Sequence, residues 1–176
     1  EAGENIIGGG YNVAIGSDAY KTATTGNYNV AIGKNAMATG LVTSNFNIGV
    51  GYDALKNQTS NGENVSLGAY SMTDSTTSQR NVAVGTYAAT GVTTGQDNVA
   101  VGHSALQENQ EGDDIVAIGR YTLYNYNPSA GDGDTVGIGS NAAYTYSTGV
   151  QSVFIGRRAG YLATTANNLV IIGREA

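Results

Sequence analysis

The chain contains no cysteine, which excludes disulfide bonds, thiolate catalysis and cysteine-based zinc sites. It also has no tryptophan, and Pro128 is its only proline. Charged residues make up 12% of the chain, about half of the usual share, so we do not expect a highly charged disordered protein. The net charge of −6 argues against partners that require a basic surface, such as nucleic acids and anionic membranes.

Long apolar runs are also missing. None approaches the roughly 20 residues that a membrane-spanning helix needs, so we expect no membrane insertion of this segment. No signal peptide is recognisable. The chain starts at Glu1 instead of a methionine, and its last repeat breaks off at Ala176. We therefore expect residues 1–176 to form a single repeat domain within a longer protein.

What the chain does contain is a short repeat. The motif Asn-Val-Ala-Ile-Gly at residues 12–16 occurs ten times with small substitutions. Its closing glycines are 17 residues apart, except for one interval of 18 and one of 20: Gly16, Gly33, Gly51, Gly68, Gly85, Gly102, Gly119, Gly139, Gly156 and Gly173. A fixed period indicates one unit that is copied and stacked. Because this unit is too short for two helices and rich in Val and Ile, we predict an all-β parallel β-solenoid of about ten coils, with two short strands per coil.

The motif positions define columns along the solenoid. The second and fourth positions, Val13 and Ile15 in the first coil, are aliphatic in all ten coils, and we predict that they form its dry core. The third position points the opposite way and is small in eight coils. We interpret it as the interface of a homotrimer. The alternatives are that each coil packs on a neighbouring segment of the same chain, or that the small residues reflect sheet propensity alone. This column comprises Ala14, Ala31, Gly49, Ser66, Ala83, Ala100, Ala117, Gly137, Phe154 and Ile171.

Two other columns suggest how neighbouring coils are joined. The invariant glycine indicates a positive φ or a corner without room for a Cβ atom. The first position is asparagine in six coils, which predicts a ladder of amide hydrogen bonds: Asn12, Asn29, Asn47, Asn64, Asn81 and Asn98. Beyond each glycine, a small residue such as Ala54 marks a tight corner, and a larger one such as Leu55 would complete the core from the second strand.

The unit Asn-Val-Ala-Ile-Gly-x-x-Ala, with Thr-Gly turns as at residues 24–26, resembles the head repeats of YadA-type trimeric autotransporter adhesins and, equally, the repeats of bacteriophage tail fibres. The resemblance extends from Asn5 to Ala176. It implies a left-handed β-roll, a homotrimer and a role in attachment outside the cell, on a virion or a cell surface. The partners that it implies are further copies of the chain and a host-surface glycan or protein receptor. Adhesin heads use shorter coils, so the period favours a tail fibre, with a bacterial adhesin head as the alternative.

Tyrosines are the candidate ligand-binding residues. The 18-residue and 20-residue coils carry extra residues at 40–46 and 124–134, and insertions in a solenoid form loops on which binding surfaces often lie. A tyrosine offers an apolar ring with a polar tip, which suits sugars and proteins. We predict binding by tyrosines in or near the second loop and in two adjacent coils, with packing along the roll as the alternative: Tyr121, Tyr124, Tyr126, Tyr70 and Tyr87.

The sequence gives no reason to expect catalysis or a bound metal. Asp132 and Asp134 could ligate calcium, but they lack the spacing of an EF-hand or a calcium-binding roll. His103 lies at a variable corner, and no carboxylate pair stands out. We expect no enzyme activity, no cofactor and no metal. A polysaccharide-degrading tailspike segment is less favoured because no carboxylate pair stands out. An ice-binding solenoid is less favoured because the threonines precede turn residues.

Overall fold

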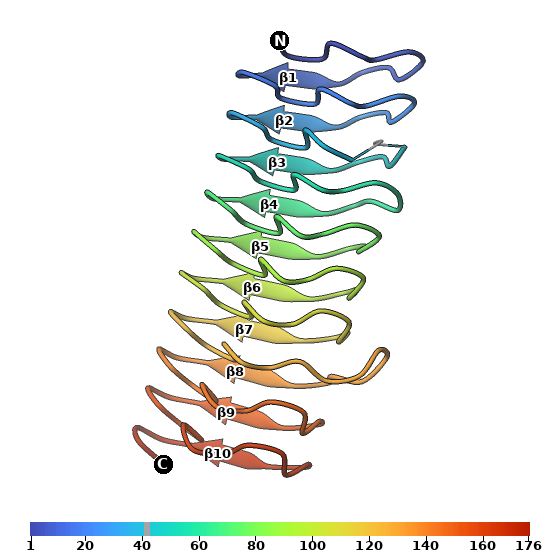
Figure 1. Ribbon diagram of the computed structural model, residues 1–176. Coiled ribbons are helices and arrows are strands. Elements are labelled where there is room, and N and C mark those ends of the chain that lie inside the picture. Colours follow the sequence, from blue (N-terminus) through green and yellow to red (C-terminus); the bar gives the residue numbers. More distant parts are fainter. Residues whose placement is uncertain (41–42) are drawn as a thin grey trace.

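Every repeat contributes one three-residue strand to a single parallel sheet (Figure 1). The structure is a computed structural model that describes residues 1–40 and 43–176. Leu41 and Val42, in the predicted loop at 40–46, lie outside the described residues. The strands follow one another in sheet order as β1 (Val13–Ile15), β2 (Val30–Ile32), β3 (Ile48–Val50), β4 (Val65–Leu67), β5 (Val82–Val84), β6 (Val99–Val101), β7 (Val116–Ile118), β8 (Val136–Ile138), β9 (Val153–Ile155) and β10 (Val170–Ile172). The predicted all-β parallel solenoid is therefore confirmed.

The strands pair without any shift in register. Val13 pairs with Val30, Ala14 with Ala31 and Ile15 with Ile32, and the same motif positions pair throughout the sheet. Each column of the repeat is thus a straight row of side chains along the rod. At about 4.8 Å between neighbouring strands, the ten strands extend over roughly 43 Å.

The predicted second strand of each coil is absent from the described residues. Turns take its place, because residues such as Met37, Leu55 and Leu106 have φ values of 51°, 49° and 53°, in the left-handed region that an extended strand cannot adopt. Hydrogen bonds between coils still form there: the Met37 N–H donates to the Ala54 carbonyl over 3.0 Å. The far side of the rod is therefore a stack of aligned turns.

The predicted orientation of the strands is wrong, since the small third position faces the interior. Ala31, Ala83 and Ala117 are completely buried, whereas Val13 and Ile15 are 43% and 57% exposed. The interior is narrow because long side chains from the opposite turns already fill it, namely Met37, Leu55, Met72, Leu106 and Leu123. Little more than a methyl group fits across from them.

The proposed trimer interface at the third position is consequently incorrect, because these side chains contact the interior of their own coil. Eight of them are buried, and the two in the terminal coils are partly buried and pack against the core. The column consists of Ala14, Ala31, Gly49, Ser66, Ala83, Ala100, Ala117, Gly137, Phe154 and Ile171. A partner chain cannot reach it without opening the coil.

The ladder of asparagines is confirmed. The Asn12 Oδ1 atom accepts the backbone N–H of Asn29 over 2.8 Å, and Asn81 and Asn98 are joined in the same way over 2.9 Å. The amide nitrogens bond to turn carbonyls, as from Asn81 Nδ2 to Gly95 O over 2.8 Å. No buried side-chain polar atom lacks a partner within the described part of the chain. The ladder therefore holds strand and turn together at one corner in the first six repeats.

The closing glycines meet both conditions that the sequence suggested. Their φ values lie between +122° and +146°, a region that other residues rarely adopt. A Cβ atom at Gly85 would also lie 2.6 Å from the carbonyl oxygen of Gly102 in the next coil. This corner has no space for a side chain.

Candidate functional surfaces

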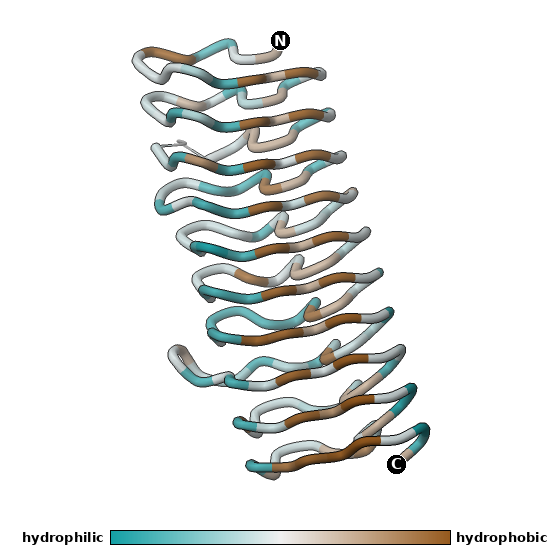
Figure 2. Tube along the Cα trace, turned by 180° about the vertical axis from the view of Figure 1, so that it is seen from behind, coloured by the Kyte–Doolittle hydropathy of each residue, from teal (hydrophilic) through white to brown (hydrophobic). Residues whose placement is uncertain are grey.

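The outward side of the sheet is an uninterrupted apolar face. We define the apolar face as the second and fourth motif positions of β1 to β10, two aliphatic side chains per strand and twenty in all. Figure 2 shows these residues as brown segments at the same place in every coil. The most exposed are Val13, Ile15, Ile48, Leu67, Ile118, Ile155, Val170 and Ile172. A continuous stripe of this extent is more than a single soluble chain normally leaves uncovered.

The two borders of the apolar face carry opposite charges. The glycine-side edge, which we define as the residue after each closing glycine, has four cations and no acid: Ser17, Lys34, Tyr52, Ala69, Thr86, His103, Arg120, Ser140, Arg157 and Arg174. The asparagine-side edge, the residue before the first motif position, has four acids and one cation: Tyr11, Tyr28, Phe46, Glu63, Arg80, Asp97, Asp114, Asp134, Gln151 and Asn168. Every residue of the second edge is exposed. The formal charges are +4 on one edge and −4 + 1 = −3 on the other.

Four of the five predicted ligand-binding tyrosines lie on the surface. The rings of Tyr70 and Tyr87 stack with centroids 5.0 Å apart, as their positions in adjacent coils suggested. Tyr121 and Tyr124 meet edge to face at 5.6 Å. In the loop at 124–134, residues 129–132 are exposed, and Figure 1 shows this loop extending beyond its neighbours.

Tyr126 is the exception, because it is completely buried and cannot bind a ligand. Its hydroxyl donates to the Gly133 carbonyl over 3.2 Å, and burial raises its pKa above the usual range. The residue lies seven positions after a closing glycine, as do the buried Val92 and Asn109 in earlier coils. The register of the repeat, rather than the loop, determines where this side chain points.

Sequence reasoning missed the length of the aromatic row to which the other four tyrosines belong. We define the aromatic stripe as Tyr52, Tyr70, Tyr87, His103, Tyr121, Tyr124, Tyr144 and Tyr161. Successive ring centroids lie between 5.0 and 6.0 Å apart. All members lie one, two or five residues after a closing glycine, so alignment of the repeats contains the signal. A shorter stack, of Tyr11, Tyr28 and Phe46, lies on the asparagine-side edge.

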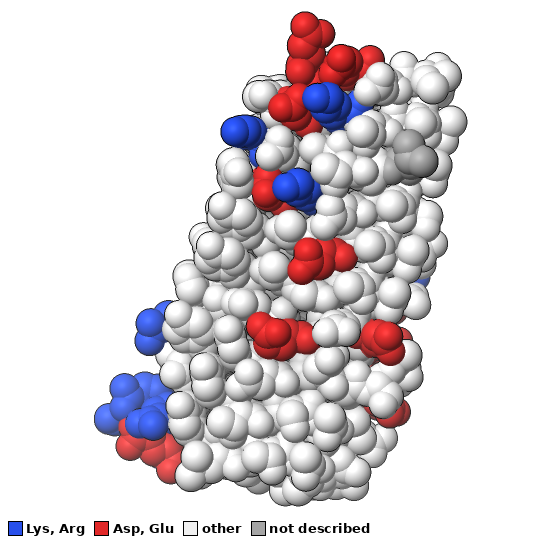
Figure 3. Space-filling view, viewed as in Figure 1, with Lys and Arg blue, Asp and Glu red and all other residues white. Residues whose placement is uncertain are grey.

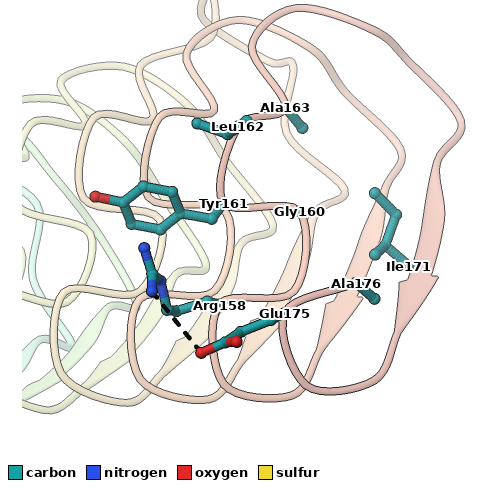
Figure 4. Close-up of a pocket in the computed structure, with 8 residues that line it drawn as sticks. All are labelled: Arg158, Gly160, Tyr161, Leu162, Ala163, Ile171, Glu175 and Ala176. Atoms are coloured by element: carbon teal, nitrogen blue, oxygen red, sulfur yellow. Dashed lines mark ion pairs between the residues drawn. The ribbon is translucent and has the colours of Figure 1, made fainter.

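Cations accompany the aromatic stripe. The guanidinium groups of Arg120 and Arg158 lie 5.0 and 4.6 Å from the ring centroids of Tyr121 and Tyr161. Figure 4 shows Arg158 between Tyr161 and Glu175.

At the C-terminal end of the stripe, three arginines share one carboxylate. The Glu175 Oε1 atom lies 2.5, 3.8 and 3.9 Å from nitrogens of Arg157, Arg158 and Arg174. The pKa of Glu175 is lowered, chiefly by its hydrogen bond with Arg157. Figure 3 shows this group as blue and red atoms at the lower left, while most of that view is uncharged. Three cations against one anion make this corner locally positive.

A cavity of about 560 Å³ opens at the last coil (Figure 4). Its lining includes Gly160, Ala163 and Ile171, whose columns are interior in preceding coils. The cavity is therefore the continuation of the rod interior to its C-terminal end, and we assign no ligand to it.

Metal-binding and membrane-spanning features are absent from the part of the chain that the structure describes. No three His, Asp or Glu side chains within residues 1–40 and 43–176 lie close enough together to hold a metal ion. In the same ranges, no helix is long and apolar enough to cross a membrane. His103 is exposed and contacts Tyr87 and Tyr121 in the aromatic stripe.

Comparison with known proteins adds no relative from which a function could be transferred. No protein-family model, curated protein or solved structure matches the chain.

Proposed function

We propose that this chain is a structural and attachment segment of a homotrimeric surface fibre, whose copies pack through the apolar face around a common axis. The observation that carries the proposal is an apolar stripe along all ten strands between oppositely charged edges. The resemblance of the repeats favours a phage tail fibre, with a bacterial adhesin head as the alternative. The fibre would be extracellular, on a virion or a cell, and non-enzymatic. Left-handed coiling remains a prediction from the resemblance.

A second copy of the chain is the partner that best fits the apolar face. The face repeats at every coil, so only a partner with the same repeat contacts all ten coils equivalently. Full burial of such a side chain contributes about 1.5–3 kcal/mol, and these are already half-buried, so each would add on the order of 1 kcal/mol. The summed contribution of the twenty side chains therefore exceeds the roughly 4–15 kcal/mol of free energy that association costs.

The charged edges favour parallel copies. Rotation about the rod axis brings the glycine-side edge of one copy against the asparagine-side edge of the next at the same height. Arg120 then meets Asp114 of the next copy, and no coil places like charges opposite each other. Turning one copy end for end would instead bring two positive edges together. Electrostatic complementarity therefore selects the parallel arrangement.

Light scattering tests the assembly. The chain has a mass of 18.0 kDa, so a trimer has three times this mass, about 54 kDa. We expect Val99→Lys with Val101→Lys to abolish the trimer, because both side chains lie outside the coil, at the centre of the face. Thr94→Lys, on an exposed turn, is the matched control and should leave the mass unchanged. A wild-type monomer at micromolar concentration would refute the proposal.

Charge exchange at the edges tests the orientation independently of the apolar face. Asp114→Arg should weaken the assembly by placing two arginines together, and adding Arg120→Asp should restore it. If the double variant is no more trimeric than Asp114→Arg, the parallel pairing is wrong.

A further inference from the structure

We propose that the corner carrying Tyr124, Tyr144, Tyr161 and Arg158 binds an acidic glycan, a chain of sugar units that bear carboxylate groups. This inference rests on the attachment part of the proposed function and names the chemical class of its ligand. It does not depend on the number of copies in the fibre.

The three tyrosines form a regular row of unused hydroxyl groups. Their rings stack in sequence, with centroids 5.2 Å and 5.4 Å apart and planes within 12° of parallel. Since the ring faces cover one another, the row offers ring edges and hydroxyls. All three residues are partly exposed, and their hydroxyls have no hydrogen bond within the described part of the chain.

The buried tyrosines show the contrast. The hydroxyls of Tyr20, Tyr126 and Tyr146 all bond inside the rod, to Asn29, Gly133 and Ala166. A buried hydroxyl needs an internal partner, whereas an exposed one can exchange water for a ligand. The surface row is therefore free to donate to, and accept from, sugar hydroxyls.

A glycan matches the periodicity of this row. One phenol stands on each of three successive coils, so the surface presents the same donor and acceptor at each step along the rod. A polysaccharide likewise repeats its hydroxyl groups at each unit or pair of units. Consecutive units can thus make equivalent contacts.

The distribution of cations indicates that the ligand is anionic. Seven of the eight Lys and Arg residues lie one, two or five residues after a closing glycine, on the corner of the aromatic stripe: Lys21, Lys34, Lys56, Arg120, Arg157, Arg158 and Arg174. Three acids lie at the same positions, since Asp18 pairs with Lys21, Asp53 pairs with Lys56 and Glu175 lies among the arginines. The corner therefore keeps four net positive charges in a chain with a net charge of −6, and these come from Lys34 and the four arginines less Glu175. The arginines around Glu175 leave an excess of two positive charges beside Tyr161.

Arg158 is the residue best placed to receive a carboxylate. Arg157 and Arg174 belong to the glycine-side edge, which the fibre would place beside a neighbouring copy. Arg158 follows that edge in sequence, lies over the Tyr161 ring and is 45% exposed in its side chain. Guanidinium groups bind carboxylates through paired, charge-assisted hydrogen bonds. Burial raises the pKa of the Tyr124 hydroxyl, and the nearby negative charge of Glu108 raises it further. Because Glu108 would repel an anion at the Tyr124 end, we expect the carboxylate of the glycan at the Arg158 end.

Binding of polygalacturonate, a carboxylated polysaccharide, tests the proposal, with uncharged dextran as the comparison ligand. We expect titration calorimetry to detect binding of polygalacturonate and no binding of dextran. Arg158→Gln should weaken binding by about tenfold, the value of one charge-assisted hydrogen bond. Joint replacement of Tyr124, Tyr144 and Tyr161 by Phe keeps the stacked rings and should weaken it to a similar degree. Tyr28→Phe, in the other aromatic stack, is the control and should bind like wild type.

Three outcomes would overturn the proposal: no binding by wild type, equal binding of dextran, or unchanged affinity in both variants. Tighter binding of single-stranded DNA than of polygalacturonate would also overturn it, since any polyanion would then suffice. Light scattering on the same samples separates this test from that of the fibre. A trimer that does not bind refutes only the glycan site, and a monomer that binds refutes only the assembly.

Discussion

One pair of residues in the ninth coil provides the sharpest test of which side of the strand faces inward. In most coils the third position is Ala, Gly or Ser, and the residue opposite is long, as with Ala100 and Leu106. In the ninth coil the sizes are reversed. Phe154 is completely buried, and the residue opposite is Gly160, where a Cβ atom would overlap the phenyl ring. The two sites share one interior volume.

Each single substitution at this pair should be destabilising. Phe154→Ala removes a buried ring whose centroid lies 4.8 Å from that of the Tyr146 ring. Such truncations lower the free energy of unfolding by about 3–5 kcal/mol. Gly160→Leu forces a side chain into the Phe154 ring, and overpacking costs about 1–3 kcal/mol or more.

The double variant should recover much of this loss, because it recreates the Ala100 and Leu106 pair of the sixth coil. The backbone permits the exchange: Gly160 has a φ of 61°, and Leu106 already occupies the equivalent position at 53°. We therefore expect a favourable coupling energy of about 3 kcal/mol, at the upper end of the range measured for contacting residues. The lost contact with Tyr146 would leave a residual cost of about 1 kcal/mol.

Urea denaturation followed by circular dichroism, on wild type, both single variants and the double variant, provides the complete cycle. Additive effects of the two substitutions would show that the residues do not share a cavity. The third position would then not face across the interior, and the assignment of Val and Ile to the outer face would fail with it.

Two other predictions follow from buried polar groups. Asn81→Ala leaves the Asn98 N–H and the Gly95 carbonyl without partners, so it should cost about 1–3 kcal/mol for each group. Thermal denaturation should show no comparable loss for Gln110→Ala, which removes an exposed amide side chain. Burial raises the pKa of Tyr20 from 10.0 to about 12, so its contribution to stability is complete below pH 10 and is lost as the pH rises through 12. Urea midpoints measured against pH should fall in this window for wild type and less steeply for Tyr20→Phe; equal slopes would contradict the assignment.

The features that recur in the backbone of every coil could be predicted from the sequence. Ten strands, their parallel order, the asparagine ladder and the glycine corner all follow from coils stacked without a register shift. In that arrangement each residue lies beside its counterpart, so a column in the sequence becomes a row in space. The row of stacked rings from Tyr70 to Tyr87 was predictable for the same reason.

The direction in which the columns point could not be read in the same way. A strand of three residues has two sides, and the usual rule places aliphatic residues inside and small ones outside. That rule fails here because the far wall consists of turns with left-handed residues, and these project Met37 or Leu55 across the narrow interior. The pattern that indicates this packing is a small third position combined with a large residue four places after the glycine. Tyr126 was misassigned for a related reason, since its distance from the glycine places it inside.

The reversed orientation changes the physical basis of the proposed trimer. With Val and Ile inside, each coil would have its own aliphatic core, and association would have rested on a row of alanines. With alanine inside, the aliphatic side chains that a domain normally buries are the ones left on the surface, and covering them supplies a larger hydrophobic gain per coil. In the proposed fibre, assembly and attachment would use different parts of one repeat: β1 to β10 and their edges would face other copies, while the corner with Tyr124, Tyr144 and Tyr161 would remain outside. Substitutions at Val99 and at Arg158 should therefore affect different measurements, and a rod in which either change altered both would not be built in this way.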